Sequence, residues 1–499
     1  MSVTVPTSLD VEIPGLESVF IAGEWVDPAE KRLIDVISPS TEDVLTQVAD
    51  PGTGDADRAI AAAQSAFADG AGAWPSMTPE ERVEVCTRLC DELEARLDDM
   101  NRAWCFEAGA PIAHGEMINS GAGKMVWREA LETALGLPWE EDRTGTLIRR
   151  EPIGVVLAVL TYNGPVVLMG MKVIPALLAG CPVIIKHAPE SPLTGRLVAE
   201  AVRAAGFPEG VVSVLPAGTE VTQYMVGHDG VDMVALTGGT KIGVDVVKRT
   251  ADRLARTALE LGGKAPAIIA EDADLDEVME TLVPGASGFL GQVCVNLSRV
   301  LAPRSRYDEV VEAMGESYRA LKVGNPFDPS VDHGPLAVKR ARDRAEHYVA
   351  VATEQGAEIV AGGKRPDDQP RGWYFEPTLL RAVDNEMTVA REEIFGPVTA
   401  VIPYDDLDQA IKIANDTPFG LAASVYSKDQ ELAMSLARRI RSGGVAINLA
   451  GISLNQPFGG FKQSGWGREC GPEGILEFTE IKQILLGGGS YLDAGDEAV

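Results

Sequence analysis

The sequence predicts an α/β protein with two α/β domains in series, the first of them built on a doubly wound parallel sheet. Three observations support this prediction. A chain of 499 residues is too long for one compact core, so two large domains are expected. From residue 151 onward, short apolar runs alternate with amphipathic segments, as in successive βαβ units. A second alternation of the same kind follows residue 264.

The first domain begins with helical sequence and continues with fully apolar strands. Residues 56–68 and 79–107 have helical spacing, and Thr-Pro-Glu-Glu at 78–81 is a favourable helix start. Short apolar runs predict buried strands at 155–160, 183–185, 211–215 and 233–236, with helices at 193–205 and 219–226. Strands buried on both faces and linked by helices form a doubly wound parallel sheet.

The second domain repeats this alternation. Strands are predicted at 265–269, 299–302 and 398–402, and helices at 307–320, 338–355 and 407–415. The last segment, 477–486, alternates like a strand at its start and is followed by three glycines. Two interpretations stay open for it: an outlying strand that pairs with another subunit, or the last strand of its own domain.

Composition excludes several classes of function. The net charge of −30 repels nucleic acid and anionic lipid, and no stripe rich in Lys or Arg offsets it. Six cysteines without a Cys-x-x-Cys pair are typical of a reducing cytoplasm, and five histidines without ligand spacing predict no metal site. No secretory signal is visible at the N-terminus. The apolar stretch 165–185 contains Lys172, Pro175 and Pro182, which favours a buried helix leading into a strand over a membrane span.

Two short segments carry the chemistry. Gly-Gln-Val-Cys at 291–294 offers the thiol of Cys294, and Glu-Leu-Gly-Gly-Lys at 260–264 offers the carboxylate of Glu260. Covalent aldehyde oxidation requires this pairing: a thiolate adds to the carbonyl, a hydride leaves, and water activated by the carboxylate frees the acid. Either segment alone is weak, because cysteines are commonly inert core residues and Glu before Gly-Gly is commonly a turn.

Further candidate residues follow predicted strands. Asn163 lies in Thr-Tyr-Asn-Gly-Pro at 161–165, where its amide can donate to a developing oxyanion, although Asn-Gly is more often a plain turn. Lys186 ends a strand, where it holds a ribose or phosphate or is merely solvated. Gly-Gly at 238–239 opens a helix whose N-terminus favours a pyrophosphate. Glu393 and Phe395 precede a strand, where they either hold a second ribose and nicotinamide or form an acidic turn.

With these motifs, the chain resembles the aldehyde dehydrogenase superfamily. Phe-Ile-Ala-Gly-Glu-Trp at 20–25, Asn-Asp-Thr-Pro-Phe-Gly-Leu at 415–421 and Pro-Phe-Gly-Gly-Phe-Lys-Gln-Ser-Gly at 457–465 also match it, and the markers run in the family's order. The resemblance implies NAD(P)-dependent, non-acylating oxidation of an aldehyde to a carboxylic acid, through a thiohemiacetal and a thioester on Cys294.

The resemblance also implies a three-part architecture and assigns the site residues. A Rossmann-like NAD(P)-binding domain is expected at 1–128 and 152–261, a catalytic domain at 262–470, and a small β oligomerisation extension with a tail at 129–151 and 471–499. Homodimers or homotetramers are expected. The predicted catalytic residues are the nucleophile Cys294, the general base Glu260 and the oxyanion donor Asn163. The predicted cofactor residues are Thr161, Tyr162, Lys186, Glu190, Gly218, Gly238, Gly239, Gly243, Leu261, Glu393 and Phe395.

Departures from the family pattern concern the cofactor and the substrate. Many NAD-preferring members have Glu three residues after the lysine; here Pro189 takes that place and Glu190 is displaced by one. We therefore expect NAD to be preferred and NADP to be accepted. Gly164 and Met171 replace aromatic residues that are frequent in the family, and Val293 flanks the nucleophile. The substrate tunnel should thus be apolar and open, suited to an apolar aldehyde.

Three alternatives differ in reaction class. A dehydrogenase that passes the thioester to coenzyme A needs no water-activating base, so Glu260 argues against it. A Cys–His hydrolase is disfavoured because the five histidines lie in no nucleophile context. A catalytically silent binding protein on the same fold is disfavoured because Cys294, Glu260 and Asn163 are all present.

Overall fold

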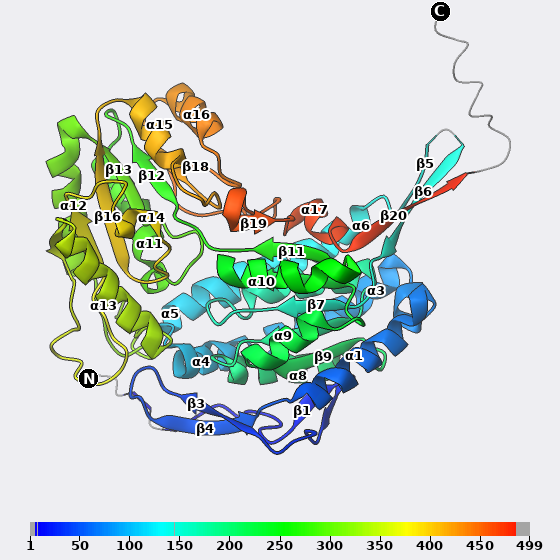
Figure 1. Ribbon diagram of the computed structural model, residues 1–499. Coiled ribbons are helices and arrows are strands. Elements are labelled where there is room, and N and C mark those ends of the chain that lie inside the picture. The colour runs from blue at the N-terminus through cyan, green and yellow to red at the C-terminus, as the bar shows by residue number, and fades with distance from the viewer. Residues whose placement is uncertain (1–4, 7, 144, 486–499) are drawn as a thin grey trace, which may run out of the picture.

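The computed structural model describes residues 5–6, 8–143 and 145–485, arranged as two α/β domains and a projecting β arm (Figure 1). Residues 486–499, the last part of the predicted extension and tail at 471–499, lie outside the described residues. The α/β fold predicted from the sequence is confirmed by two large, mainly parallel sheets with helical connections.

The first domain is built on an eight-stranded sheet. Its parallel core runs in the order β11 (Arg256–Glu260), β10 (Met233–Thr237), β7 (Val156–Val159), β8 (Val183–His187) and β9 (Val212–Pro216). The edges are antiparallel: β1 (Val19–Ile21) and β2 (Glu24–Val26) beyond β9, and β19 (Gly465–Trp466) beyond β11. Strand order reverses between β7 and β10, so a crevice opens beyond their carboxyl ends, where doubly wound sheets bind ligands.

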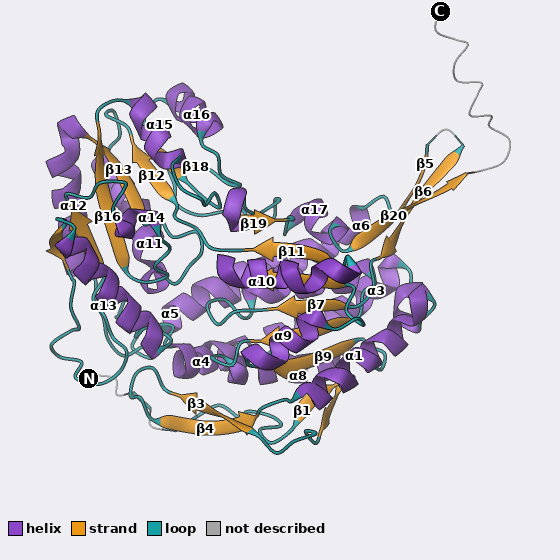
Figure 2. Cartoon of the chain, in the orientation of Figure 1, coloured by secondary structure: helices purple, strands orange, loops and turns teal. Residues whose placement is uncertain are grey.

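Helices cover both faces of this sheet (Figure 2). Alternate residues of β7 face opposite cores, Val156 and Ala158 one and Leu157 and Val159 the other. The first core holds α3 (Pro79–Glu94), α4 (Leu97–Ala108), α6 (Lys124–Gly136), α7 (Ile174–Ala179) and α8 (Pro192–Ala205). The second holds α1 (Thr53–Phe67), α9 (Thr219–Gly227) and α10 (Thr240–Thr250). The doubly wound arrangement is therefore confirmed.

The helical stretch expected at 79–107 is two helices. α3 starts as predicted, with the Thr78 side chain accepting from the Glu81 N–H at 3.2 Å. The break falls at Arg96, whose φ of −112° and ψ of 7° are not helical. Both halves are amphipathic, so helical periodicity alone does not show the break.

The second domain is built on a seven-stranded sheet, parallel except at one edge. Its order is β14 (Glu358–Ala361), β15 (Thr378–Arg381), β16 (Val398–Tyr404), β13 (Arg299–Pro303), β12 (Pro266–Ile269), β17 (Ser424–Tyr426) and β18 (Ala446–Ile447). One face packs α11 (Leu275–Ser287) and α12 (Tyr307–Ala320), and the other packs α13 (Lys339–Glu354), α15 (Leu407–Asn415) and α16 (Gln430–Arg439).

A separate three-stranded sheet forms the arm that projects from the body in Figure 1. The C-terminal strand β20 (Thr479–Leu485) pairs with β6 (Thr146–Pro152), which pairs with β5 (Glu140–Asp142). Within one chain, β20 thus belongs to the arm rather than to either domain sheet. Two elements do not follow the predicted domain boundaries. The boundary between residues 128 and 129 falls inside α6, and β19, which lies in the predicted catalytic domain at 262–470, pairs with the sheet of the first domain. We propose the three-part division with these two elements assigned to the first domain.

Smaller elements complete the chain. The hairpin of β3 (Leu33–Ile37) and β4 (Val44–Ala49) lies at the N-terminal side, and the short helices are α2 (Ala73–Ser76), α5 (Ile112–Gly115), α14 (Thr388–Arg391) and α17 (Gly471–Leu476). The apolar stretch 165–185 is the predicted buried helix and strand, α7 and β8. Across the described part of the chain, no helix has the length and apolar character needed to span a membrane.

Candidate active site

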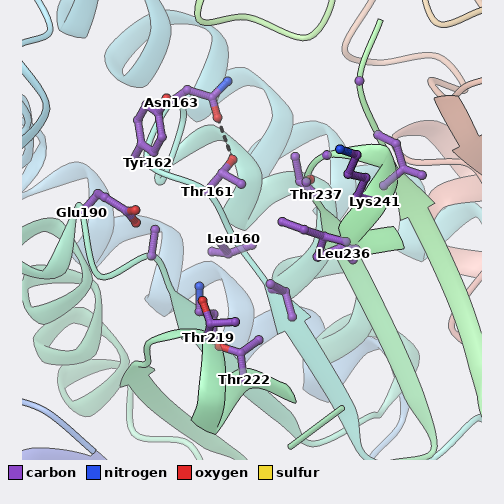
Figure 3. A pocket seen from close by; sticks show the side chains of 18 of the residues that line it. Leu160, Thr161, Tyr162, Asn163, Glu190, Thr219, Thr222, Leu236, Thr237 and Lys241 are labelled. Carbon is purple, nitrogen blue, oxygen red and sulfur yellow. Dashed lines mark hydrogen bonds between the residues drawn. The ribbon is translucent and has the colours of Figure 1, made fainter. Parts of the chain in front are cut away.

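A cavity of about 550 Å³ opens at the crevice between β7 and β10 (Figure 3). The loops after β7, β8 and β10 form one wall, and residues of the second domain, including Val338 and Phe395, form the other. The cavity therefore lies where the order of parallel strands reverses and where the two domains meet, which are both preferred places for ligand sites.

Most of the predicted site residues line this cavity. They are Thr161, Tyr162, Asn163, Lys186, Glu190, Gly238, Gly239, Leu261, Cys294, Glu393 and Phe395. Three predicted residues do not: Gly218 caps α9, Gly243 lies on α10, and Glu260 ends β11. A Cβ on Gly243 would lie 2.6 Å from the Leu261 side chain, so this glycine lets α10 pack closely behind a wall residue.

Lys186 is a buried cation at the end of β8. Only 8 % of the residue is exposed, and burial lowers the pKa of the Lys186 ammonium to about 8, against the opposing effect of Glu190. A buried amine without a close carboxylate gains from hydroxyl or phosphate oxygens. Its position fits the predicted contact with a ribose or phosphate.

Glu190 is paired with a residue that the sequence did not indicate. Its carboxylate forms an ion pair with Arg340, on the first turn of α13 in the second domain. Both residues line the cavity, and the side chains are 20 % and 69 % exposed. Arg340, in the second domain, thus partly neutralises the Glu190 carboxylate, which lies near the position expected for the adenosine ribose.

Two helices begin with glycine at the edge of the cavity. α9 and α10 have Gly218 and Gly239 at their N-caps, and neither has a side-chain cap. Uncapped N–H groups at a helix N-terminus favour a phosphate. The hydroxyl of Thr237, which lines the cavity at the end of β10, is buried without a hydrogen-bond partner. Cavity volume, uncapped helices and orphaned hydroxyl together fit a dinucleotide.

Cys294 is the one half-buried cysteine; the other five are buried, and all six are free thiols. Burial, assisted by the negative charges of Glu260, Glu393 and Glu469, raises the pKa of the Cys294 thiol to about 12. The thiol is therefore protonated at neutral pH in this structure, and it must lose its proton before it attacks a carbonyl.

The glycines of the 260–264 segment are required by close packing. A Cβ on Gly262 would lie 2.0 Å from a carboxylate oxygen of Glu393, and one on Gly263 would lie 2.5 Å from the Cys294 carbonyl. The Gly263 N–H donates to Glu393 Oε1 at 3.2 Å. The two glycines thus bring the loop after β11 against both Cys294, the predicted nucleophile, and the Glu393 carboxylate.

The surroundings of Glu260 fit its predicted role of general base. Only 5 % of the residue is exposed, and neither carboxylate oxygen has a hydrogen-bond partner. Burial and then the charge of Glu469 raise the pKa of Glu260 well above its usual value, while Lys172 opposes this. A carboxylate without partners can accept a proton from water.

Lys172 and Glu469 form a buried ion pair beside Glu260 that the sequence did not assign to the site. The two residues are 297 positions apart, and both side chains are nearly inaccessible. In the sequence, Lys172 stands out only as a charge that interrupts an apolar run. A buried lysine needs an anionic partner, and that requirement is the available sequence signal for the pair.

Asn163 is held in one orientation by two hydrogen bonds. Its Oδ1 accepts from the Thr161 hydroxyl at 2.6 Å (Figure 3), and its Nδ2 donates to the Gln292 carbonyl at 2.9 Å. One amide hydrogen is therefore used and the other is left for a second acceptor. Because Gln292 precedes Cys294 by two residues, the Asn163 amide lies against the loop that carries Cys294, which fits the predicted role of oxyanion donor.

The rings of Phe395 and Tyr162 meet edge to face in the wall of the cavity. Their ring centroids are 6.3 Å apart and nearly perpendicular, at 84°. Both rings come from loops at the domain boundary. Over the described residues, no group of three or more His, Cys, Asp or Glu side chains is placed to hold a metal ion.

Comparison with known proteins gives matches over nearly the whole chain. Residues 25–484 match the aldehyde dehydrogenase family. The geranial dehydrogenase of Castellaniella defragrans is 38 % identical over 475 residues, covering 94 % of this chain and 98 % of that protein.

Two solved structures have the same fold. An aldehyde dehydrogenase of Mycobacterium tuberculosis complexed with NAD⁺ is 41 % identical with a TM-score of 0.93, covering 95 % of this chain and 99 % of the other. A cysteine-to-alanine mutant of aldehyde dehydrogenase C of Pseudomonas syringae, complexed with NAD⁺ and octanal, is 36 % identical with a TM-score of 0.92, covering 96 % and 99 %.

Proposed function

The chain belongs to the aldehyde dehydrogenase family, and we propose that it oxidises an apolar aldehyde to the carboxylic acid with NAD through a covalent intermediate on Cys294. One observation carries the proposal: a half-buried thiol and a fixed amide line the cavity where the two domains meet, and an unpartnered buried carboxylate lies close enough to act on the pKa of the thiol. When bound, NAD supplies the acceptor for the hydride.

The first half of the reaction uses Cys294 and Asn163. The Cys294 thiol releases its proton to solvent, and the sulfur adds to the aldehyde carbon and forms a thiohemiacetal whose oxygen carries the negative charge. The free hydrogen of the Asn163 amide and the Cys294 main-chain N–H stabilise that charge. The C–O⁻ group then reforms a carbonyl as the hydride leaves, which gives a thioester.

The second half uses Glu260. Its carboxylate takes a proton from a water molecule, the hydroxide oxygen attacks the thioester carbon, and the C–S bond breaks to release the acid and the Cys294 thiolate. The buried Lys172–Glu469 pair acts on the pKa of Glu260: the Glu469 carboxylate raises this pKa and the Lys172 ammonium lowers it. A raised pKa makes Glu260 a stronger base than an ordinary glutamate.

An apolar substrate is supported by the surroundings of the nucleophile. Cys294 and its neighbour Val295 pack against the apolar core of the first domain, and Val293 packs against a smaller apolar cluster that contains Trp104 and Phe289. A Cβ at Gly164 would lie 2.9 Å from the Val167 side chain, so the residue beside Asn163 adds no bulk of its own to this apolar region. Two relatives have names that agree: geranial dehydrogenase and the octanal complex.

A panel of aldehydes tests the reaction and its substrate class. Each additional buried CH₂ contributes about 0.8 kcal/mol, so we expect octanal to have a kcat/KM at least about tenfold above that of propanal. Reduced-cofactor absorbance measures the rate, and chromatography without coenzyme A should show the free acid. Absence of cofactor reduction with every aldehyde would refute the proposed function, and a requirement for coenzyme A would replace it with the acylating reaction.

Cofactor preference should depend on the Glu190–Arg340 pair. We expect NAD to be preferred and NADP to be used at a measurable rate. The NADP activity is expected because Arg340 partly neutralises the Glu190 carboxylate, which would otherwise repel the 2′-phosphate of NADP. Arg340→Gln should lower kcat/KM for NADP by about tenfold and change kcat/KM for NAD by less than about threefold. The loss with NADP is no larger because the Arg340 side chain is exposed and solvent screens its charge.

Two further variants complete this test. Lys339→Gln removes a charge from the same helix turn that is paired with Asp343 instead, and it should leave both cofactors unchanged. Glu190→Gln should raise NADP use. Equal losses for the two cofactors in Arg340→Gln would show that the pair does not discriminate between them.

We also propose that the β arm joins copies of the chain into a homodimer or homotetramer. Ile481, Ile484 and Leu485 of β20 are exposed apolar side chains on a narrow projecting sheet, which supports a second copy as their partner. Light scattering after size exclusion measures the oligomeric state, and a monomer at micromolar concentration would contradict this proposal.

We further propose that the protein works in the cytoplasm. Its six free thiols support a reducing compartment.

A further inference from the structure

Gln292 lies two residues before the nucleophile, at the end of a strained turn. Phe289, Leu290 and Gly291 all have positive φ, at 46°, 52° and 68°. Non-glycine residues adopt this conformation only when their surroundings hold them there. The Gln292 side chain is completely buried, and its Nε2 and main-chain N–H both donate to the Phe289 carbonyl at 3.1 Å. Gln292 therefore closes the turn that presents Cys294.

The side-chain oxygen of Gln292 joins two other segments. Gln292 Oε1 accepts from the Ala337 N–H at 3.1 Å, just before α13 in the second domain. It also accepts from the Tyr162 hydroxyl at 3.3 Å, in the loop after β7 of the first domain. Both lone pairs of the oxygen are thus used, and the residue is fixed from both domains.

The main-chain carbonyl of Gln292 orients the Asn163 amide. It accepts one hydrogen of Asn163 Nδ2 at 2.9 Å, while Thr161 holds the other end of the amide. The direction of the remaining Asn163 hydrogen then follows from the position of this carbonyl. Misplacement of a catalytic group by about 1 Å can cost on the order of 10²-fold in rate.

We propose that Gln292 is a positioning residue for the oxyanion site. Three side-chain hydrogen bonds hold residue 292 so that its carbonyl fixes the donor hydrogen of Asn163. Gln292 acts through Asn163 and does not touch the reacting atoms. The inference rests on the proposed function, in which Asn163 stabilises the oxyanion.

The test compares Gln292→Met, which keeps length and loses the amide, with Asn163→Ala. Asn163→Ala should lower kcat by on the order of 10²-fold. Gln292→Met should lower kcat by about 10- to 100-fold and leave the dissociation constant of NAD within about twofold. In the Asn163→Ala background, Gln292→Met should change kcat by less than about threefold, because no donor is left to orient.

Two controls separate positioning from general damage to the fold. Gln355→Met removes an exposed glutamine amide that bonds Thr388, and it should leave kcat unchanged. The rate of Cys294 alkylation by iodoacetamide should stay within about threefold of wild type in Gln292→Met. If Gln292→Met does not fold, Tyr162→Phe removes one of the three bonds, and its smaller loss of kcat should likewise vanish in the Asn163→Ala background.

Two results would overturn the proposal. One is a full multiplicative loss when Gln292→Met is added to Asn163→Ala, which would mean that Gln292 only supports the fold. The other is normal kcat in Gln292→Met together with a large loss in Asn163→Ala. Normal kcat in Asn163→Ala would instead refute the oxyanion role on which the inference rests.

Discussion

Replacing Cys294 with alanine should abolish aldehyde oxidation, with a loss of at least about 10⁴-fold in kcat. In the proposed reaction the Cys294 sulfur bonds to the substrate, and no other described cysteine lies in the cavity. Cofactor binding should change little, because the helix termini, Lys186 and Glu393 are untouched. Cys294→Ser should be almost as inactive, since a hydroxyl ionises less readily than a thiol and is a poorer acyl leaving group.

Cys86→Ala is the matched control for this prediction. Cys86 is buried in the first-domain core on α3, outside the cavity. The substitution should lower the free energy of unfolding by on the order of 1 kcal/mol and leave kcat unchanged. Steady-state rates, NAD titrations and thermal melts are compared for the wild type, Cys294→Ala and Cys86→Ala. Near-normal turnover in a folded Cys294→Ala variant would rule out the covalent route.

Glu260→Gln should separate the two halves of the reaction. Hydride transfer precedes deacylation, so a first turnover should still produce a burst of reduced cofactor in stopped flow. The steady state should then slow by about 10²- to 10⁴-fold, because no base activates the water. Acid quenching should trap the thioester, seen by mass spectrometry as added acyl mass on Cys294. Loss of the burst itself would instead assign Glu260 to activation of the thiol.

The pH dependence of the steady state gives a second test of Glu260. The carboxylate must be deprotonated to accept a proton, so the deacylation rate should rise with pH. Because the pKa of Glu260 is raised, the half-point should lie well above 4.5. Glu260→Gln should remove this limb. Glu477→Gln, which removes another nearby carboxylate, should keep both the burst and a rising limb.

Local sequence was sufficient for most of the strands and helices that carry the site. Strands β7 to β10 each contain a short, mainly apolar run, and these runs are buried on both faces of the sheet, so pattern and structure agree. Strand β11 is not predicted, because its first residues, Arg256 and Thr257, are not buried and it lacks the apolar run that marks the others. The motifs around Cys294, Glu260 and Asn163 are visible because glycines and turn residues leave a local signature.

Partners distant in the chain were decided only by the tertiary structure. Lys172 meets Glu469 across 297 positions, Glu190 meets Arg340 across 150, and Asn163 meets Gln292 across 129. Backbone propensity and periodicity act over one or two turns, so they specify elements and the ends of strands. Which charge neutralises a buried lysine, or which carbonyl orients an amide, depends on how the two domains pack. That packing brings together side chains whose local sequence contains no information about one another.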